Sequence, residues 1–330
     1  MAKSSTVTKP RDILGNSALR PDGAHKVQGS FEFTSDMHAE NMLWGATLRS
    51  PHPYAKIVSI DTSAALALSG VHCVITADDV PGKPTYGLIS SDQPVFAKDV
   101  VRYMGEPVAA VAADHPETCR RALSLITVVY EVLTPLTDPE DAIAGSFDPI
   151  HPDGNVIRHQ RIIRGDQTIT GAVVVEGEYV IGMQDQAFLG LEAALAIPDP
   201  DGLGLHLHVA TQWLHEDLTQ ISTCLNMPAE KVRLTLGGVG GAFGAREDIS
   251  LQVHCCLLAL KAGRPIKMQY SREESFFGHV HRHPATIFMR HHADANGKIV
   301  KIDARFVFDG GAYTSTSPAV LINGITHTQG

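Results

Sequence analysis

The sequence predicts an α+β protein of about two domains. Three observations lead to this fold class: the length of 330 residues, the 44% apolar and 19% charged composition, and the mixture of strand-like and helical patterns along the chain. A chain of this length and composition can bury a real core.

Short strands are predicted to dominate the opening part of the chain. Residues 29–36, 43–50 and 57–60 are rich in β-forming side chains, and the sequence Pro51-His-Pro interrupts them. We therefore expect the N-terminal part to be β-rich.

A β-α-β unit is predicted next. Residues 107–113 form an apolar run typical of a buried strand, and Pro116 suits the first turn of a helix that continues to Ile126. Residues 127–132 then begin a new strand.

A linker is predicted at 135–154, because Pro, Asp and Gly recur there at short intervals. Beyond it, apolar residues at helical spacing predict a helix that ends before Pro228; they are Leu214, Leu218, Ile221 and Leu225. Residues 231–236 alternate like a strand and lead directly into a glycine-rich segment.

This glycine-rich segment, residues 237–247, is the clearest functional feature, and we call it the glycine loop. It holds five glycines between the predicted strand and a predicted helix at 248–262. Glycines allow positive φ and leave N–H groups uncovered, and a helix N-terminus favours anions such as phosphate. Arg246 adds a formal positive charge.

A simpler interpretation stays open at this point. The loop could be a tight strand-to-helix turn in which Glu247 and Asp248 stabilise the first helical turn. A nucleotide site is weakly supported, because the segment lacks both the Gly-Lys-Ser/Thr ending of a P-loop and the GxGxxG spacing of a dinucleotide fold.

The segment Gly240-Gly-Ala-Phe-Gly-Ala-Arg-Glu resembles the GGGFGGKE motif of the molybdenum hydroxylases, the xanthine dehydrogenase and aldehyde oxidase family. Other segments resemble this family in order and approximate spacing, from about Asp12 to the end of the chain. They include Leu48-Arg-Ser-Pro-His-Pro-Tyr, Tyr103-Met-Gly-Glu-Pro-Val, Thr211-Gln, Ser271-Arg-Glu-Glu, Arg282-His-Pro and Asp309-Gly-Gly-Ala-Tyr.

The resemblance implies an N-terminal α/β hammerhead domain followed by the first part of a mixed α/β molybdopterin-binding domain. The implied divisions are a tail at 1–14, the hammerhead domain at 15–134, the linker at 135–154, and an incomplete molybdopterin cofactor-binding domain at 155–330.

The resemblance also implies a molybdenum–molybdopterin cofactor that hydroxylates an electron-poor carbon with oxygen from water. Gln212 would hydrogen-bond a ligand of the molybdenum, and Glu247 would hold a heterocyclic substrate. The backbone amides expected beside the cofactor are those of Gly241, Ala242, Phe243 and Gly244.

Three positions depart from the family motif. Ala242 and Ala245 stand where glycine is usual, and Arg246 replaces lysine. An alanine that needed positive φ would cost around 1 kcal/mol and shift the loop. The resemblance implies that the acid at Glu247 favours a purine such as xanthine or hypoxanthine over a simple aldehyde, although nicotinate or another N-heterocycle would use a similar carboxylate.

A rival metal site is conceivable at His279-Val-His-Arg-His, because alternate residues of a strand share one face and the imidazoles would converge. The family resemblance implies no metal there, and no carboxylate lies nearby in the sequence. We assign no catalysis to two acidic pairs, because such carboxylates are usually solvated or salt-bridged. They are Glu273 with Glu274 and Asp185 with Glu192.

The chain is less than half as long as the family's cofactor subunit, so the resemblance implies that the catalytic glutamate and most pterin contacts lie in a missing C-terminal half. No catalytic residue is expected here. We expect activity only in a complex with a chain bearing that half and with iron–sulfur and FAD subunits. The alternatives are a non-catalytic remnant or scaffold, and a nicotinate- or aldehyde-specific enzyme.

Charge and composition exclude other classes of function. The net charge of −9 and pI near 6.0 argue against nucleic-acid binding. No run approaches the ~18 apolar residues of a membrane span, and the N-terminus lacks a secretory core, so we expect a cytoplasmic protein. The five cysteines show no CxxC spacing, so any iron–sulfur cluster must lie on another subunit.

Overall fold

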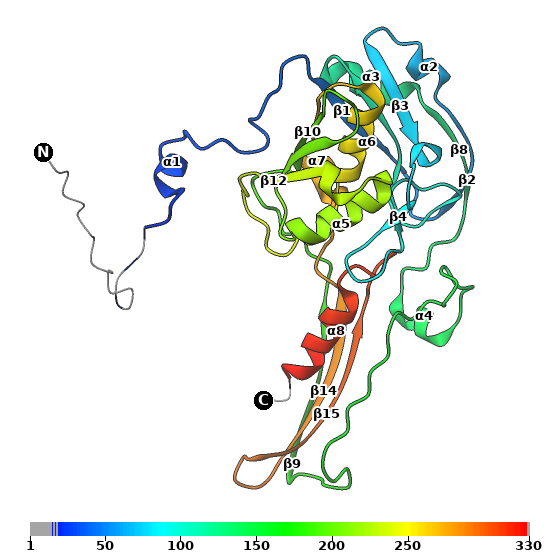
Figure 1. The fold of residues 1–330 in the computed structure, drawn as a ribbon. Helices are drawn as coiled ribbons and strands as arrows, with labels where there is room; N and C mark the ends of the chain where they lie inside the picture. Colours follow the sequence, from blue (N-terminus) through cyan, green and yellow to red (C-terminus); the bar gives the residue numbers. More distant parts are fainter. Residues whose placement is uncertain (1–14, 16, 18, 329–330) are drawn as a thin grey trace, which may run out of the picture.

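A mixed seven-stranded sheet forms the centre of the computed structural model, which describes residues 15, 17 and 19–328 (Figure 1). The predicted tail at 1–14 lies outside the described residues. In spatial order the strands are β12 (Val232–Leu236), β11 (Leu205–Val209), β10 (Ala193–Pro198), β13 (Ile266–Gln269), β1 (Leu43–Arg49), β7 (Pro107–Ala113) and β3 (Val71–Thr76).

The two parts of the chain meet inside this sheet. Strand β1, from the N-terminal part, pairs in parallel with β13, from the second part, with Leu43 opposite Ile266. Strands from both sides of the predicted linker therefore share one continuous hydrogen-bonded sheet.

Helices cover both faces of the sheet. Helix α3 (Pro116–Leu125) packs against one face, and α6 (Gln252–Ala262) against the other. Successive residues of β7 consequently alternate between two cores: Val111 packs on the α3 side, while Ala110 and Ala112 pack on the α6 side. This explains why every residue of β7 is buried and why the strand is a continuous apolar run.

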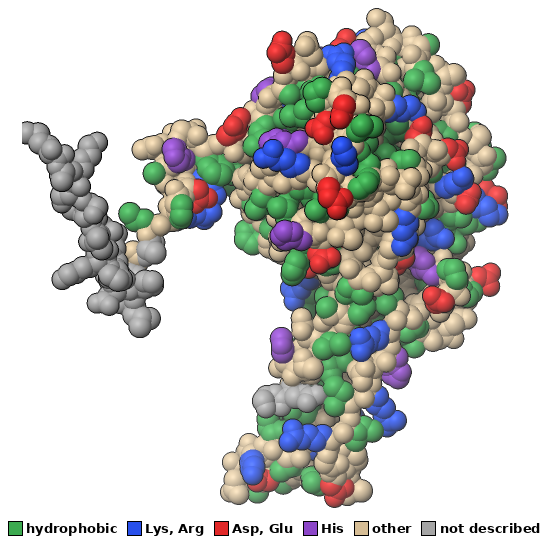
Figure 2. All heavy atoms as spheres, viewed as in Figure 1, with side chains coloured by type: hydrophobic (Ala, Val, Ile, Leu, Met, Phe, Trp, Pro, Cys, Tyr) green, Lys and Arg blue, Asp and Glu red, His purple; other side chains and the backbone are tan. Residues whose placement is uncertain are grey.

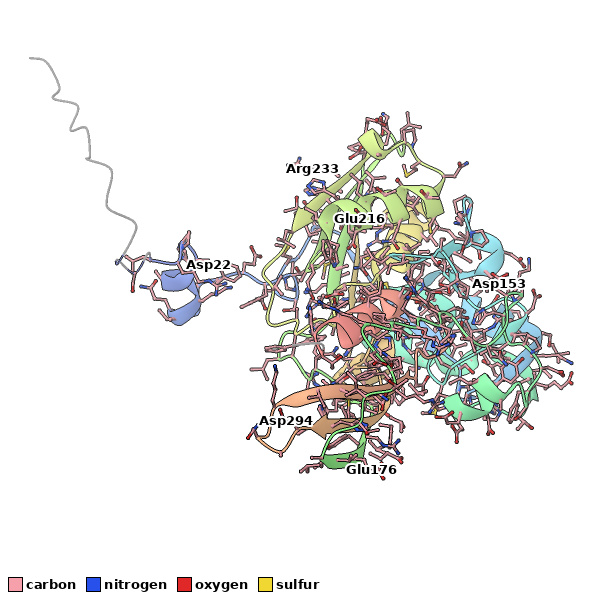
Figure 3. All side chains as sticks on the ribbon, turned by 90° about the horizontal axis from the view of Figure 1, so that it is seen from below. Asp22, Asp153, Glu176, Glu216, Arg233 and Asp294 are labelled. Carbon is pink, nitrogen blue, oxygen red and sulfur yellow. The ribbon has the colours of Figure 1, made fainter. Side chains whose placement is uncertain are left out.

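Helix α6 is the central element of the larger core. Its residues from Gln252 to Ala259 are all buried, so it has no polar face. Helix α5 (Leu214–Leu225) packs against α6 and against β12 at the edge of the sheet. Figure 3 shows Glu216 of α5 and Arg233 of β12 together at this end of the molecule.

Two smaller sheets complete the body. One has the order β6 (Val100–Val101), β2 (Ala55–Asp61), β8 (Thr127–Val132), and the other pairs β4 (Thr85–Tyr86) with β5 (Gln93–Pro94). The remaining short helices are α1 (Gly23–Val27), α2 (Ser63–Leu66), α4 (Pro139–Ala144), α7 (Arg272–Gly278) and the 3₁₀ turns Ala77–Asp79 and Ala229–Lys231.

A long antiparallel sheet projects from the body, and we call it the arm. It consists of β9 (Val173–Ile181), β14 (Ala285–Ala293) and β15 (Ile299–Phe308), and α8 (Ser317–Thr326) lies beside β15 (Figure 1). Apolar side chains are exposed along β9, and Figure 2 shows apolar and charged side chains interspersed on the visible face of the arm. Among the described residues, no helix is both long enough and apolar enough to cross a bilayer.

The α+β fold class is confirmed, and so are the predicted strands β1, β2, β7, β8 and β12 and the predicted helices α3 and α5. Two element predictions were wrong. Residues 29–36 form a turn, closed by a bond from the Phe33 N–H to Asp36 Oδ2 (3.0 Å), and contribute only an isolated bridge to Gly238. Helix α6 begins at Gln252 and not at 248.

The predicted linker contains a short helix. In α4, Pro139 occupies the first turn, and the Asp138 carboxylate accepts a hydrogen bond from the Glu140 N–H (2.8 Å). The Asp-Pro pair that suggested a loop is thus a helix start.

Candidate functional site

The glycine loop begins where the parallel strands β11 and β12 end. The Gly237 N–H donates to the Val209 carbonyl oxygen (2.8 Å), which fixes the first residue of the loop to the sheet. Gly240 then packs against Gly190, whose N–H donates to the Gly240 carbonyl oxygen (3.1 Å). A Cβ on either glycine would lie 2.7 Å from the Cα of the other, so this contact requires glycine on both sides.

Positive φ occurs at three loop residues: Gly241 (+109°), Phe243 (+53°) and Gly244 (+90°). Neither Ala242 nor Ala245 is among them, so the two alanines fit the loop without backbone strain. The strain falls on Phe243, where a left-handed conformation costs about 1–3 kcal/mol. Its ring is 77% exposed, so no packing among the described residues offsets this cost.

Arg246 is buried inside the loop and does not present its charge to a ligand. Its guanidinium donates to the carbonyl oxygens of Gly241 (3.0 Å), Ala210 (3.5 Å) and Gly190, and lies 4.3 Å from the centre of the Phe188 ring. Burial lowers the pKa of Arg246. The expectation that Arg246 adds positive charge to an anion pocket was therefore wrong, because its guanidinium is buried and donates to the carbonyl oxygens of Gly241, Ala210 and Gly190.

Gln212, just before α5, is held against the same loop by two hydrogen bonds. Its N–H donates to the Arg246 carbonyl oxygen (3.1 Å), and its side-chain oxygen accepts from the Arg246 N–H (3.3 Å). With Oε1 fixed in this way, the Nε2 amide group makes no hydrogen bond to the described residues, and the side chain is exposed. Gln212 can therefore offer an oriented N–H donor to a bound group.

Glu247, the last residue of the glycine loop, and Asp248 both lie outside helix α6. The first turn of α6 contains no acidic residue, and its N-cap, Leu251, is fully buried. Two predictions were thus wrong: that the two acids stabilise the first turn of the helix through its dipole, and that the helix N-terminus beside the loop binds an anion. Asp248 accepts a hydrogen bond from the Ser315 hydroxyl, whereas Glu247 is half-buried, and burial followed by repulsion from Asp248 raises its pKa.

The loop surface fits a bulky cofactor by two structural criteria. No heavy atom lies within 4 Å of the position that a Cβ of Gly244 would occupy, so the chain is open in front of this residue. The exposed Phe243 ring and the Gln212 amide flank the loop and supply an apolar and a polar contact. The Arg246 guanidinium, in contrast, is buried and donates to carbonyl oxygens of the protein.

The histidine-rich segment after α7 does not bring three imidazoles together. His283 turns away, with its Nε2 2.8 Å from the Ser317 hydroxyl. His279 and His281 instead approach Asp185, at 2.9 Å and 3.0 Å. No local sequence pattern indicates this carboxylate, because it belongs to the connection between β9 and β10.

Glu274 and Glu192, from the two acidic pairs considered, have structural partners. Glu274 pairs with Arg49 (3.0 Å), and Glu192 Oε1 lies 2.8 Å from His279 Nδ1. The structure thus assigns Glu274 to an ion pair that links α7 to β1.

Comparison with known proteins identifies the family. Residues 28–134 match the family described as "Aldehyde oxidase and xanthine dehydrogenase, a/b hammerhead domain", and residues 150–330 match the "Molybdopterin cofactor-binding domain". Both matches follow the order that the motifs predicted.

Two relatives align over nearly the whole chain. The chain is 37% identical over 317 residues to a probable xanthine dehydrogenase subunit from Bacillus subtilis, covering 95% of this chain and 42% of that protein. It is 34% identical to the nicotinate dehydrogenase large molybdopterin subunit of Eubacterium barkeri, covering 98% and 76%. The chain thus spans less than half of the first relative.

Solved structures agree with the sequence relatives. The aldehyde oxidoreductase of Desulfovibrio gigas superposes with a TM-score of 0.88 at 25% identity, covering 92% of this chain and 35% of that one. Quinoline 2-oxidoreductase of Pseudomonas putida 86 gives 0.81 at 28% identity, covering 88% and 39%. The chain belongs to the aldehyde oxidase and xanthine dehydrogenase family, as its motifs predicted, and carries a molybdopterin cofactor-binding domain.

Proposed function

We propose that this chain forms one wall of the molybdopterin site of a cytoplasmic, xanthine dehydrogenase-like hydroxylase. The proposal depends on the pair of hydrogen bonds that holds Gln212 against the glycine loop. These bonds leave the Gln212 Nε2 amide group free to donate beside the backbone of the loop. In this arrangement the bound molybdenum cofactor supplies the oxidative hydroxylation of a substrate carbon with oxygen from water.

The loop residues would hold the cofactor through their backbone. The N–H groups proposed to face it are those of Gly241, Ala242, Phe243 and Gly244. Gln212 Nε2 would donate to a ligand of the metal, and its fixed Oε1 means that little conformational freedom is lost on binding. The exposed Phe243 ring would shield one side of the site from water.

Glu247 is proposed to select the substrate. A half-buried carboxyl with a raised pKa can accept from a ring N–H when ionised, or donate to a ring nitrogen when protonated. This chemistry favours a purine, in a step of purine catabolism, or another N-heterocycle. Similarity to proteins named for xanthine, nicotinate and quinoline supports a heterocycle, while the aldehyde oxidoreductase keeps an aldehyde as the alternative.

We also propose that the rest of the active site comes from polypeptide outside these residues. It would include the base that takes a proton from the attacking water, and iron–sulfur and FAD subunits would accept the electrons. The proposal rests on the relatives, which extend beyond the aligned part. In the competing proposal the chain is a non-catalytic remnant or scaffold.

Coexpression with a polypeptide that carries the C-terminal half of the relatives tests the function. We expect the copurified complex to contain about one molybdenum per chain by elemental analysis and to hydroxylate a purine. Gln212→Ala should reduce turnover about 100-fold or more, in the range for loss of a hydrogen bond to a reacting centre. Glu216→Ala, an exposed change on α5, is the matched control and should leave turnover unchanged.

Two outcomes would contradict the proposal. One is a complex that contains molybdenum but is insensitive to Gln212→Ala. The other is an isolated 330-residue chain that itself binds molybdenum and hydroxylates purines. Copurification without molybdenum or activity would favour the scaffold.

A further inference from the structure

A partly buried cluster of two imidazoles and a carboxylate lies between the connection 184–192 and the segment after α7. Asp185 Oδ2 is 2.9 Å from His279 Nε2 and 3.0 Å from His281 Nε2. The two imidazole rings are stacked, with their centres 5.1 Å apart. We propose that Asp185, His279 and His281 bind a divalent transition-metal ion, and that Zn²⁺ is its best match.

The three ligand atoms lie close together but form no hydrogen bonds with one another. Asp185 Oδ2 and His279 Nε2 are both buried, and neither has a hydrogen-bond partner in the part of the chain that the structure describes. The short contacts are therefore not aligned as N–H···O bonds. Burying such groups unpaired costs free energy, and one cation bound between them would satisfy both atoms.

Neighbouring groups hold the ligands in the form that a metal requires. Glu192 Oε1 lies 2.8 Å from His279 Nδ1 and can accept a hydrogen bond from its N–H, which leaves the lone pair on Nε2. The Ala187 N–H donates to Asp185 Oδ1 (2.6 Å) and leaves Oδ2 for the ion.

The ligand types select the class of ion. Two imidazole nitrogens and one carboxylate oxygen suit Zn²⁺, with a fourth position left for water, whereas Ca²⁺ and Mg²⁺ prefer sites made of oxygen alone. The side chain of His279 is 1% exposed, but those of Asp185 and His281 are 18% and 19% exposed. Because Asp185 and His281 are partly exposed, an ion can reach the site from solvent.

The site would connect to the glycine loop through Phe188. The Phe188 ring lies 5.0 Å from the His279 ring on one side and 4.3 Å from the Arg246 guanidinium on the other. An ion bound at Asp185 and His279 would fix the connection that carries Phe188 and Gly190, and so the packing beneath the loop. Zinc binding itself does not depend on the proposed hydroxylase function.

The test titrates Zn²⁺ into the metal-free 330-residue chain by calorimetry, with competition against a colorimetric chelator. We expect one saturable site per chain and a higher Tm when Zn²⁺ is bound. Asp185→Asn keeps Oδ1 for the Ala187 N–H but removes the anionic ligand, and His281→Gln removes the more exposed imidazole. Each should weaken binding about 100-fold, and Glu192→Gln about 10- to 100-fold.

His206→Gln provides the matched control. His206 and His208 also form a close imidazole pair, with ring centres 4.0 Å apart, but among the described residues no carboxylate completes a site there and His206 Nε2 contacts the Thr235 hydroxyl. Its zinc affinity should equal that of the wild type.

Absence of a saturable one-to-one site in the wild type would overturn the proposal. Wild-type affinity in both Asp185→Asn and His281→Gln would do so as well, provided that circular dichroism shows both variants folded. Because the readout is zinc affinity, these outcomes are independent of whether the chain binds molybdopterin.

Discussion

At the scale of single residues, Gly244 is the position of the glycine loop where glycine is required by its backbone conformation alone and not by close packing. Its φ is +90°, yet a Cβ there would meet no atom within 4 Å, so only the backbone opposes a side chain. We expect Gly244→Ala to lower the free energy of unfolding by about 1–2 kcal/mol, measured by urea denaturation.

Gly182→Ala is the control for this change. Gly182 also has open space around its Cβ position but lacks the positive φ of Gly244. The alanine variant should unfold within about 0.5 kcal/mol of the wild type or be slightly more stable. Equal effects of the two substitutions would show that the left-handed conformation at Gly244 is not the cause.

Asp217 is a second residue for which we expect a measurable effect, here on the pH dependence of stability. It is fully buried on α5 and accepts a hydrogen bond from Gln252 of α6 (3.3 Å), and burial raises its pKa from 3.8 to about 6. The folded state therefore binds the proton more tightly than the unfolded state. This contribution to stability is greatest below about pH 4 and is lost as the pH rises through 6.

Asp217→Asn removes this titration. Its stability relative to the wild type should rise between pH 4 and pH 7, by up to about 3 kcal/mol. Urea unfolding at several pH values measures the difference. Glu216→Gln, a neighbouring exposed change, should show no such trend. A pH-independent gain in Asp217→Asn would mean that Asp217 does not titrate in this range.

Residue identity predicted some of the candidate site and not the rest. The glycine loop and Gln212 could be found because short motifs carry them, and the structure brings the two together. Asp185 and His279 could not be paired, because they lie on different connections and no local pattern links them. The burial of the Arg246 side chain could not be predicted either, because the sequence does not show which carbonyl groups lie near it in the fold.

At the scale of elements, periodic apolar patterns located the strands and helices but not their ends. Ile249 lies in phase with the apolar face of α6, which favours a helix start at 248. One tertiary and one local contact oppose this: the Ser315 hydroxyl binds Asp248, and the Ser250 N–H donates to the Gln252 side chain (2.7 Å). Polar contacts outside the helical pattern thus decide where α6 begins.

The segment 313–315 makes one of these contacts, and it fastens the region after β15 to the body. The Tyr313 hydroxyl donates to the fully buried Glu106, and the Thr314 N–H donates to Asp92 (2.8 Å). We expect Tyr313→Phe to lower the free energy of unfolding by about 1–3 kcal/mol, because Glu106 loses a partner while buried.

Tyr179→Phe on the arm is the control for Tyr313→Phe. Tyr179 is 58% exposed, so its hydroxyl can bind water, and the substitution should change stability by less than about 0.5 kcal/mol. Urea denaturation compares both variants with the wild type. If Tyr313→Phe is as neutral as the control, the segment 313–315 does not depend on Glu106.

At the scale of the whole molecule, the shared sheet argues against independent folding of the N-terminal part. Helix α6, from the second part, covers one face of β3 and β7, and its His254 binds the Val95 carbonyl (2.7 Å) and stacks on Phe96, with ring centres 4.5 Å apart. Removal of α6 and β13 would expose this face and leave the edge of β1 unpaired.

We therefore expect a fragment of residues 15–134 to remain largely unfolded, whereas the full chain should unfold its body in one cooperative transition. Phe96 and Val95 share with α6 a core that is absent from the fragment, so burial of these side chains no longer stabilises the sheet there. Amide dispersion in a ¹H–¹⁵N spectrum of the fragment, together with binding of a hydrophobic dye, measures the outcome. A fragment with well-dispersed amide signals and no dye binding would contradict this expectation, because its core would then form without α6.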